Sequence, residues 1–119
     1  MADALTARRL ERERLIALAR EYVERLSARL TVEAAAVVGS VARGDFNVWS
    51  DVDVLVVVDG LPERAPDRAA LLLADAPAGV QPVGFTPREL EQARGKRNPL
   101  VLEADTRGVV LVGDGVFGT

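Results

Sequence analysis

Two apolar runs rich in β-branched residues constrain this chain more than any other feature. They are Ala34–Val38, which ends at Gly39, and Asp51–Val58, which ends at Asp59-Gly60. Short runs of this kind, bounded by glycine, are typical of strands inside a sheet. The sequence therefore predicts a sheet containing two strands joined by residues 39–50, with the rest of the chain packed around it.

Helical patterns fill most of the remaining chain. Residues from about Leu5 to Leu30 place apolar side chains three and four positions apart, on one face of a helix. Thr86-Pro87-Arg88-Glu89 matches a capping box with proline at the first helical position, and the helix that it opens should end at Gly95. Two more helices are predicted, one over Pro66–Ala74 and one between Asn98-Pro99 and Gly108. Two more strands are predicted over Val80–Phe85 and Val109–Val112. Pro82 lacks an N–H for strand pairing, which favours a sheet edge or a short strand.

These elements predict helices packed around a small sheet, in one domain spanning residues 1–119. A hydrophobic fraction of 49% and a charged fraction of 28% are ordinary for a globular protein. The glycine-rich residues 113–119 predict a frayed tail. No apolar run approaches membrane-spanning length, and the first residues contain no apolar export signal, so we expect a cytoplasmic protein without a membrane partner.

Composition excludes several kinds of chemistry. The chain contains no cysteine and no histidine, so disulfides, thiolate or imidazole metal ligands and a histidine general base are excluded. Carboxylates, hydroxyls, backbone N–H groups and arginines remain, and oxygen ligands favour Mg²⁺ or a similarly hard divalent cation. A net charge of -3 disfavours nucleic acid as a partner.

The residues after the first strand are suited to binding phosphate. Gly39 permits a sharp turn with the backbone close to a ligand, and the following residues can begin a short helix. Free N–H groups at such a turn, with the Ser40 hydroxyl, form a cradle for phosphate oxygens. Arg43 follows one turn later, where its guanidinium can pair with a phosphate.

Two carboxylates begin the second apolar run. Asp51 and Asp53 are two positions apart in the predicted strand, so both side chains share one face, ~6–7 Å apart. Such a pair can hold Mg²⁺ ions that bridge nucleotide phosphates. A lone Gly-Ser is usually a turn and a lone Asp-x-Asp a solvated strand start, but their conjunction matches metal-assisted phosphoryl or nucleotidyl transfer. For Trp49, the only tryptophan, a core or interface role is preferred to stacking on a base.

The pattern Gly39-Ser40-x-Ala42-Arg43-Gly44, followed by Ser50-Asp51-x-Asp53-x-Leu55-Val56, resembles the motif of minimal nucleotidyltransferases in the DNA polymerase beta superfamily. The resemblance implies an α+β nucleotidyltransferase fold, a small mixed β-sheet packed with helices. It implies that Gly39, Ser40, Arg43 and Ser50 contact the nucleotide, and that Asp51 and Asp53 are catalytic and bind Mg²⁺. The implied activity transfers a nucleoside monophosphate, with ATP as the expected donor of AMP, to a hydroxyl group.

One position departs from the family pattern. The superfamily has a third carboxylate on the next strand, and alignment on Thr86-Pro87 places it at Gln81, or at Val83 in a shifted register. Neither residue is acidic, and an amide cannot take the proton that a general base accepts. Three other carboxylates are candidates only if the fold brings them close: Asp75, Glu103 and Asp105.

Two hypotheses follow. In the first, the chain is an active enzyme that works with two aspartates and Gln81, or with a third carboxylate from a substrate, a partner or another subunit. In the second, it binds a nucleotide or a partner without turnover, as an antitoxin module. The resemblance implies a helical HEPN-domain toxin as partner in either case, because such domains commonly form these pairs in prokaryotes. Val109–Val112 and the first helix offer a surface for a homodimer.

Overall fold

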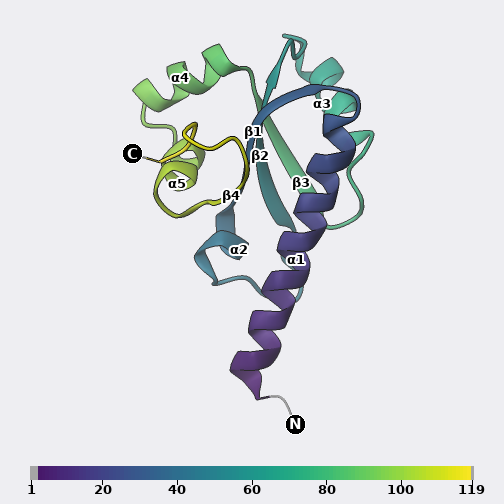
Figure 1. Ribbon diagram of the computed structural model, residues 1–119, viewed down its shortest axis with the longest axis vertical. Coiled ribbons are helices and arrows are strands. Elements are labelled where there is room, and N and C mark those ends of the chain that lie inside the picture. The colour runs from purple at the N-terminus through teal and green to yellow at the C-terminus, as the bar shows by residue number, and fades with distance from the viewer. Residues whose placement is uncertain (1–2, 119) are drawn as a thin grey trace.

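The computed structural model describes residues 3–118. Figure 1 shows a long N-terminal helix on one side of a sheet and shorter helices on the other. The elements follow in the order α1 (Ala4–Ser27), β1 (Thr31–Val38), α2 (Gly39–Arg43), β2 (Val52–Asp59), α3 (Ala65–Leu73), β3 (Val80–Phe85), α4 (Pro87–Gly95), α5 (Pro99–Arg107) and β4 (Val109–Val112).

The four strands form one mixed sheet in the order β3-β2-β1-β4. β1 is antiparallel to both β2 and β4, whereas β2 and β3 are parallel and are joined by a crossover through α3. β3 lies at an edge, as Pro82 predicts. Since β1 and β2 are antiparallel, the end of β1 lies beside the start of β2, and Val38 pairs with Asp53.

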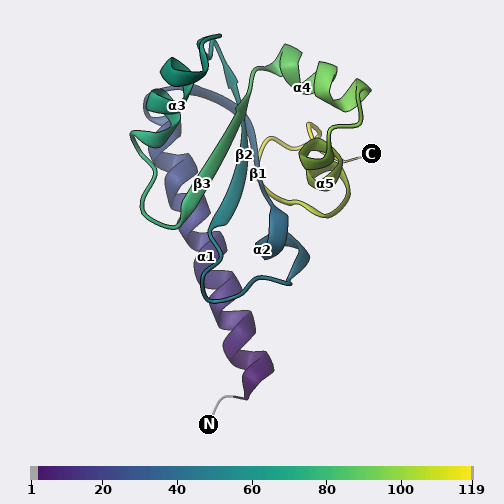
Figure 2. The same cartoon turned by 180° about the vertical axis from the view of Figure 1, so that it is seen from behind.

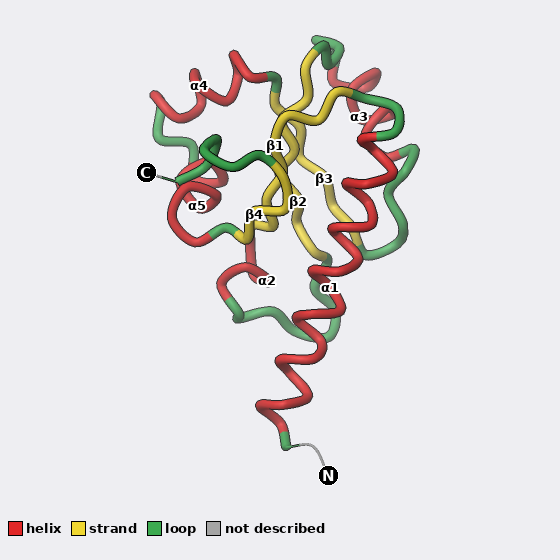
Figure 3. Tube along the Cα trace, viewed as in Figure 1, coloured by secondary structure: helices red, strands yellow, loops and turns green. Residues whose placement is uncertain are grey.

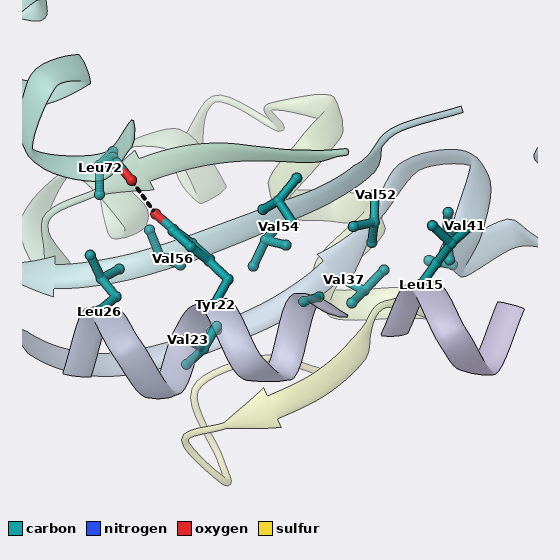
Figure 4. Packing of buried hydrophobic residues seen from close by; sticks show 14 of the residues in the cluster. Leu15, Tyr22, Val23, Leu26, Val37, Val41, Val52, Val54, Val56 and Leu72 are labelled. Atoms are coloured by element: carbon teal, nitrogen blue, oxygen red, sulfur yellow. Dashed lines mark hydrogen bonds between the residues drawn. The ribbon is translucent and has the colours of Figure 1, made fainter. Parts of the chain in front are cut away.

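Side chains from α1 cover one face of the sheet. Leu15, Tyr22 and Leu26 are buried there against alternate residues of β2, including Val54 and Val56 (Figure 4). The Tyr22 hydroxyl donates a 2.8 Å hydrogen bond to the Leu72 carbonyl, which ties α1 to the end of α3. The predicted apolar face of the first helix is therefore confirmed.

Helices α4 and α5 cover the opposite face of the sheet, as Figure 2 shows with the molecule turned by 180°. Leu90 from α4 and Val101 from α5 pack there with Leu55 and Val57 of β2. Both helices begin as the sequence predicts. Thr86 forms both bonds of the capping box of α4, and Asn98 accepts hydrogen bonds from backbone N–H groups at the start of α5.

Some boundaries differ from the sequence-based prediction. α1 ends at Ser27 rather than Leu30, because β1 begins at Thr31, three residues before the predicted start. Pairing of Thr31 with Asp59 extends the ladder that far. Asp51 precedes β2 instead of opening it. Within residues 3–118, no helix has the length and apolar character needed to cross a membrane.

Residues 113–118, for which the sequence predicts a frayed tail, lie packed against α4 and α5 in the structure. Phe117 is buried with α4 and α5, and Arg94 donates a 3.0 Å hydrogen bond to the Val116 carbonyl. The three glycines of this segment adopt φ values between 86 and 95°, so they form turns that return the chain to α5. Figure 3 shows this terminal loop lying beside α5. Thr119 lies outside the described residues.

Candidate active site

The turn at Gly39 connects β1 to α2. Gly39 has a φ of 75°, a left-handed conformation that favours glycine. A Cβ atom at this position would collide with the Asp53 carboxylate. The turn predicted to bind phosphate therefore lies directly against one of the two predicted metal-binding aspartates.

Asp53 and Asp51 lie at the start of β2. Asp53 alternates with Leu55 and Val57, so its side chain lies on the same face of the sheet as α4 and α5. It is half-buried, whereas Asp51 is exposed. Burial raises the pKa of the Asp53 carboxyl, the charges of Asp51 and Glu103 raise it further, and Arg43 lowers it. Negative charge is therefore concentrated beside the Gly39 turn.

Gln81 lies next to Asp53 across the parallel β2–β3 ladder, where the two residues are register partners. Val83 is the partner of Leu55, so the structure selects Gln81 as the neighbour of the carboxylate. The side chain of Gln81 is exposed. The strand that should supply a third carboxylate thus presents an amide, which accepts hydrogen bonds but takes no proton at neutral pH.

Glu103 is the acidic residue that the fold does bring to this site. It lies on α5, and its Oε1 accepts the N–H of Gly39. Arg43 donates from Nη1 to both carboxylate oxygens, at 3.2 and 3.1 Å. The other two candidate carboxylates are in ion pairs with other arginines: Asp75 with Arg29, and Asp105 with Arg94. Among residues 3–118, no group of three acidic residues is close enough to hold a metal ion.

Comparison with known proteins agrees with this arrangement. The family of nucleotidyltransferase domains matches residues 19–106, which include β1, β2, β3 and the whole candidate site. The chain belongs to this family. No curated protein matches the chain significantly.

A solved structure supports the fold of this nucleotidyltransferase domain. A candidate nucleotidyltransferase from Sulfolobus solfataricus is 24% identical in sequence and superposes with a TM-score of 0.65. The match covers 87% of this chain and 84% of the other. The α+β fold expected from the sequence motif is therefore confirmed. Family membership supports transfer of nucleotidyl groups in general, and such domains generally use a divalent metal ion.

Arg43 of the nucleotidyltransferase domain does not point freely toward a ligand. Besides its contacts with Glu103, it donates from Nε to Asp45 at 3.2 Å. Its predicted pairing with a phosphate would therefore take place beside these two carboxylates. Ser50, also predicted to contact the nucleotide, accepts a 2.9 Å hydrogen bond from the N–H of Asn47, and so supports the loop before Asp51.

Trp49 projects from this same loop. Its side chain is 88% exposed, so a role in the core is wrong, and an interface or stacking role is left. The Asn47 side chain accepts a 2.8 Å hydrogen bond from the backbone N–H of Trp49, which shapes the loop and leaves the indole ring in solvent. The single tryptophan therefore lies on the surface, two residues before Asp51.

Sequence reasoning missed two arginines that hold α2 and its loop in place. Arg8 donates to the carbonyls of Gly44 and Phe46, and its guanidinium lies 4.5 Å from the centre of the Phe46 ring. Arg12 donates to the carbonyls of Val41 and Ala42. Both extend from α1 to the carboxyl end of α2, where unpaired carbonyls favour cations. Nothing in the spacing of α1 distinguishes these arginines from its other charged residues.

Proposed function

We propose that this domain is a Mg²⁺-dependent nucleotidyltransferase that moves a nucleoside monophosphate, AMP from ATP, to a hydroxyl group. One observation carries the proposal: a Cβ atom at position 39 would collide with the Asp53 carboxylate, so the Gly39 turn lies directly against that side chain. This contact makes the phosphate-binding turn and the metal-binding carboxylates parts of one site. We also propose that the chain forms one such domain.

The residues present fit Mg²⁺. Asp51 and Asp53 offer hard oxygen ligands. Burial is the main cause of the raised pKa of Asp53, and a cation would relieve the repulsion from Asp51 and Glu103 that adds to it. Since Asp51 and Asp53 supply two carboxylates, the remaining ligands would come from the triphosphate and water. When bound, Mg²⁺ supplies charge neutralisation at the phosphates and favours attack by the acceptor oxygen.

The predicted site residues each have a proposed role in this reaction. The Gly39 N–H and Ser40 hold phosphate oxygens, while Arg43 and Ser50 flank them. The acceptor oxygen forms a bond to the α-phosphorus, the bond from that phosphorus to the bridging oxygen of the β-phosphate breaks, and pyrophosphate leaves. The hydroxyl proton needs an acceptor that Gln81 cannot provide. We propose that a substrate, a partner or another subunit supplies this base.

The direct test uses ATP labelled at the α-phosphate, with MgCl₂ and lysate of the source organism. We expect label to move to a protein or small acceptor, and the double variant Asp51→Asn/Asp53→Asn to abolish the transfer. If Mg²⁺-ATP binds but no label moves, the domain is a binding module. Absence of both binding and transfer would contradict both functions.

The binding module is the second candidate function, and the amide beside Asp53 favours it. Gln81→Asp separates the candidates, with Gln92→Asp on the exposed surface of α4 as the matched control. If the natural site lacks only its base, Gln81→Asp should increase label transfer by roughly 10²-fold. Unchanged activity in an active domain would mean that another group takes the proton.

We propose a HEPN-domain protein as partner, with the domain acting as its antitoxin in the cytoplasm. The support is an exposed apolar set near the N-terminal part of α1 and the loop after α2: Leu5, Leu10, Val48 and Trp49. A homodimer through β4 is the alternative, since Val110 and Val112 are also exposed. Trp49→Ala should weaken binding to a purified HEPN partner, whereas Val112→Ala should not. The reverse result would favour the β4 surface.

A further inference from the structure

We propose that the Glu103 carboxylate competes with nucleotide phosphate for the donors of the Gly39 turn, so that a triphosphate must displace it in order to bind. The inference rests on the proposed function and deepens it, because it names a residue that sets nucleotide affinity from outside the sequence motif.

The donors that Glu103 contacts are the ones assigned to phosphate. Its Oε1 accepts the Gly39 N–H, and Arg43 donates to both of its oxygens. Carboxylates and phosphates accept hydrogen bonds from the same backbone N–H and guanidinium groups. Glu103 therefore satisfies, from within the chain, the groups that would otherwise face a nucleotide.

Charge prevents both anions from using these donors together. Glu103 and Asp51 both lie close enough to Asp53 for their negative charges to act on its carboxylate, and Arg43 is the cation that opposes them. Asp45 also takes a share of the Arg43 guanidinium. A triphosphate placed on the Gly39 turn beside Glu103 would add negative charge within contact distance of a carboxylate. Displacement of Glu103 removes this repulsion.

The side chain can leave without disturbing the fold. Glu103 lies in the middle of α5, whose packing on the sheet depends on Val101 and Ala104. Its own side chain is 18% exposed, so one side of it already faces solvent. Rotation about the side-chain torsions releases Gly39 and Arg43 while the backbone of α5 stays in place.

The test measures by titration calorimetry how tightly Glu103→Gln and the unsubstituted protein bind inorganic tripolyphosphate and, separately, Mg²⁺-ATP. Glu21→Gln is the matched control, because Glu21 also pairs with an arginine, at 2.7 Å, but on the surface of α1. We expect Glu103→Gln to bind tripolyphosphate about tenfold more tightly and the control to be unchanged. Glu103→Ala, which removes the carboxylate entirely, should bind at least as tightly as Glu103→Gln.

The outcomes separate this inference from the proposed function. Tighter tripolyphosphate binding without any transfer of AMP would support the inference and overturn the proposed activity. Equal binding by Glu103→Gln and the natural chain would overturn the inference, whether or not AMP is transferred. Weaker binding with unchanged thermal unfolding would also overturn it, since Glu103 would then support the turn rather than compete. Absence of tripolyphosphate binding in every variant would overturn it as well.

Discussion

Gly39 and Gly44 are two glycines at opposite ends of α2 that face different surroundings. Both adopt left-handed backbone conformations, with φ of 75° and 90°. A Cβ atom at Gly44 would have no heavy atom within 4 Å, whereas one at Gly39 would collide with the Asp53 carboxylate. The two positions therefore share a left-handed backbone conformation and differ in packing.

We expect Gly39→Ala to destabilise the domain more than Gly44→Ala. Each substitution costs roughly 1–2 kcal/mol because alanine disfavours the left-handed conformation. Gly39→Ala must also displace Asp53, which adds about 1–3 kcal/mol, and it should abolish nucleotide binding. Urea denaturation of both variants measures the difference in the free energy of unfolding. Equal losses would show that Asp53 moves aside without cost.

At the scale of elements, one buried hydroxyl couples α1 to α3. Tyr22 is fully buried, and its hydroxyl donates to the Leu72 carbonyl. Burial, and then the nearby charge of Asp75, raise the pKa of Tyr22 to about 12 from its ordinary 10.0. The neutral phenol is thus the form that the fold requires.

Tyr22→Phe should lower the free energy of unfolding at pH 7 by about 1–2 kcal/mol, because the Leu72 carbonyl loses its donor. The raised pKa means that the contribution of Tyr22 is fully present below pH 10 and is lost as the pH rises from about 10 to about 12. The two proteins should therefore converge in stability across this range. Denaturant unfolding at several pH values tests this, with Thr106→Val as an exposed hydroxyl control. A constant difference up to pH 12 would contradict the prediction.

A second link joins α4, α5 and the terminal segment. Asp105 accepts hydrogen bonds from Arg94 Nε and Nη2 at 2.8 and 2.9 Å, and from the Gly118 N–H at 3.1 Å. The Arg94 hydrogen bond is the main cause that holds the pKa of the Asp105 carboxyl below its ordinary value, while burial opposes it. The fold therefore favours the ionised form.

Asp105→Asn should lower the free energy of unfolding at pH 7 by about 1–2 kcal/mol, since the charge-assisted hydrogen bonds are weakened. A lowered pKa means that this stability is present above the unfolded value of 3.8 and is lost as the pH falls through the folded pKa. The difference between the variants should thus shrink in acid. Thermal unfolding from pH 7 downward measures it, and Asp59→Asn on the exposed end of β2 is the control. A pH-independent difference would assign the loss to packing.

At the scale of the whole molecule, the two faces of the sheet are closed differently. α1 and α3 complete the core on one face, while the other needs the terminal segment in addition to α4 and α5. Phe117 is 9% exposed, and it packs beside this second core. The last described residues therefore contribute to the layer that positions Glu103.

Phe117→Ala should lower the free energy of unfolding by about 2–4 kcal/mol, because it leaves a cavity beside α5. Val48→Ala, at a position that is 85% exposed, is the control and should change stability by less than about 0.5 kcal/mol. Urea denaturation of both variants provides the measurement. If Phe117→Ala matched the control, the terminal segment would contribute nothing to the core.

The sequence by itself determined the features that depend on neighbours along the chain. Short-range spacing predicts the caps at Thr86 and Asn98 and the apolar face of α1. The missing N–H of Pro82 favours the edge position that β3 adopts. The family motif lies in one continuous segment, residues 39–56, so the resemblance to nucleotidyltransferases is recognisable from the sequence without the fold. The roles of its individual residues stay predictions.

Only the tertiary structure decided which distant groups meet. Glu103 reaches Gly39 across 64 positions, while Asp75 and Asp105 form ion pairs with other arginines. The sequence offered all three as equal candidates, because a contact between separated segments depends on how helices pack on the sheet. The terminal glycines likewise indicated fraying, although Phe117 is buried. Burial of a side chain depends on the space that the packed helices and strands leave for it, and composition does not predict that space.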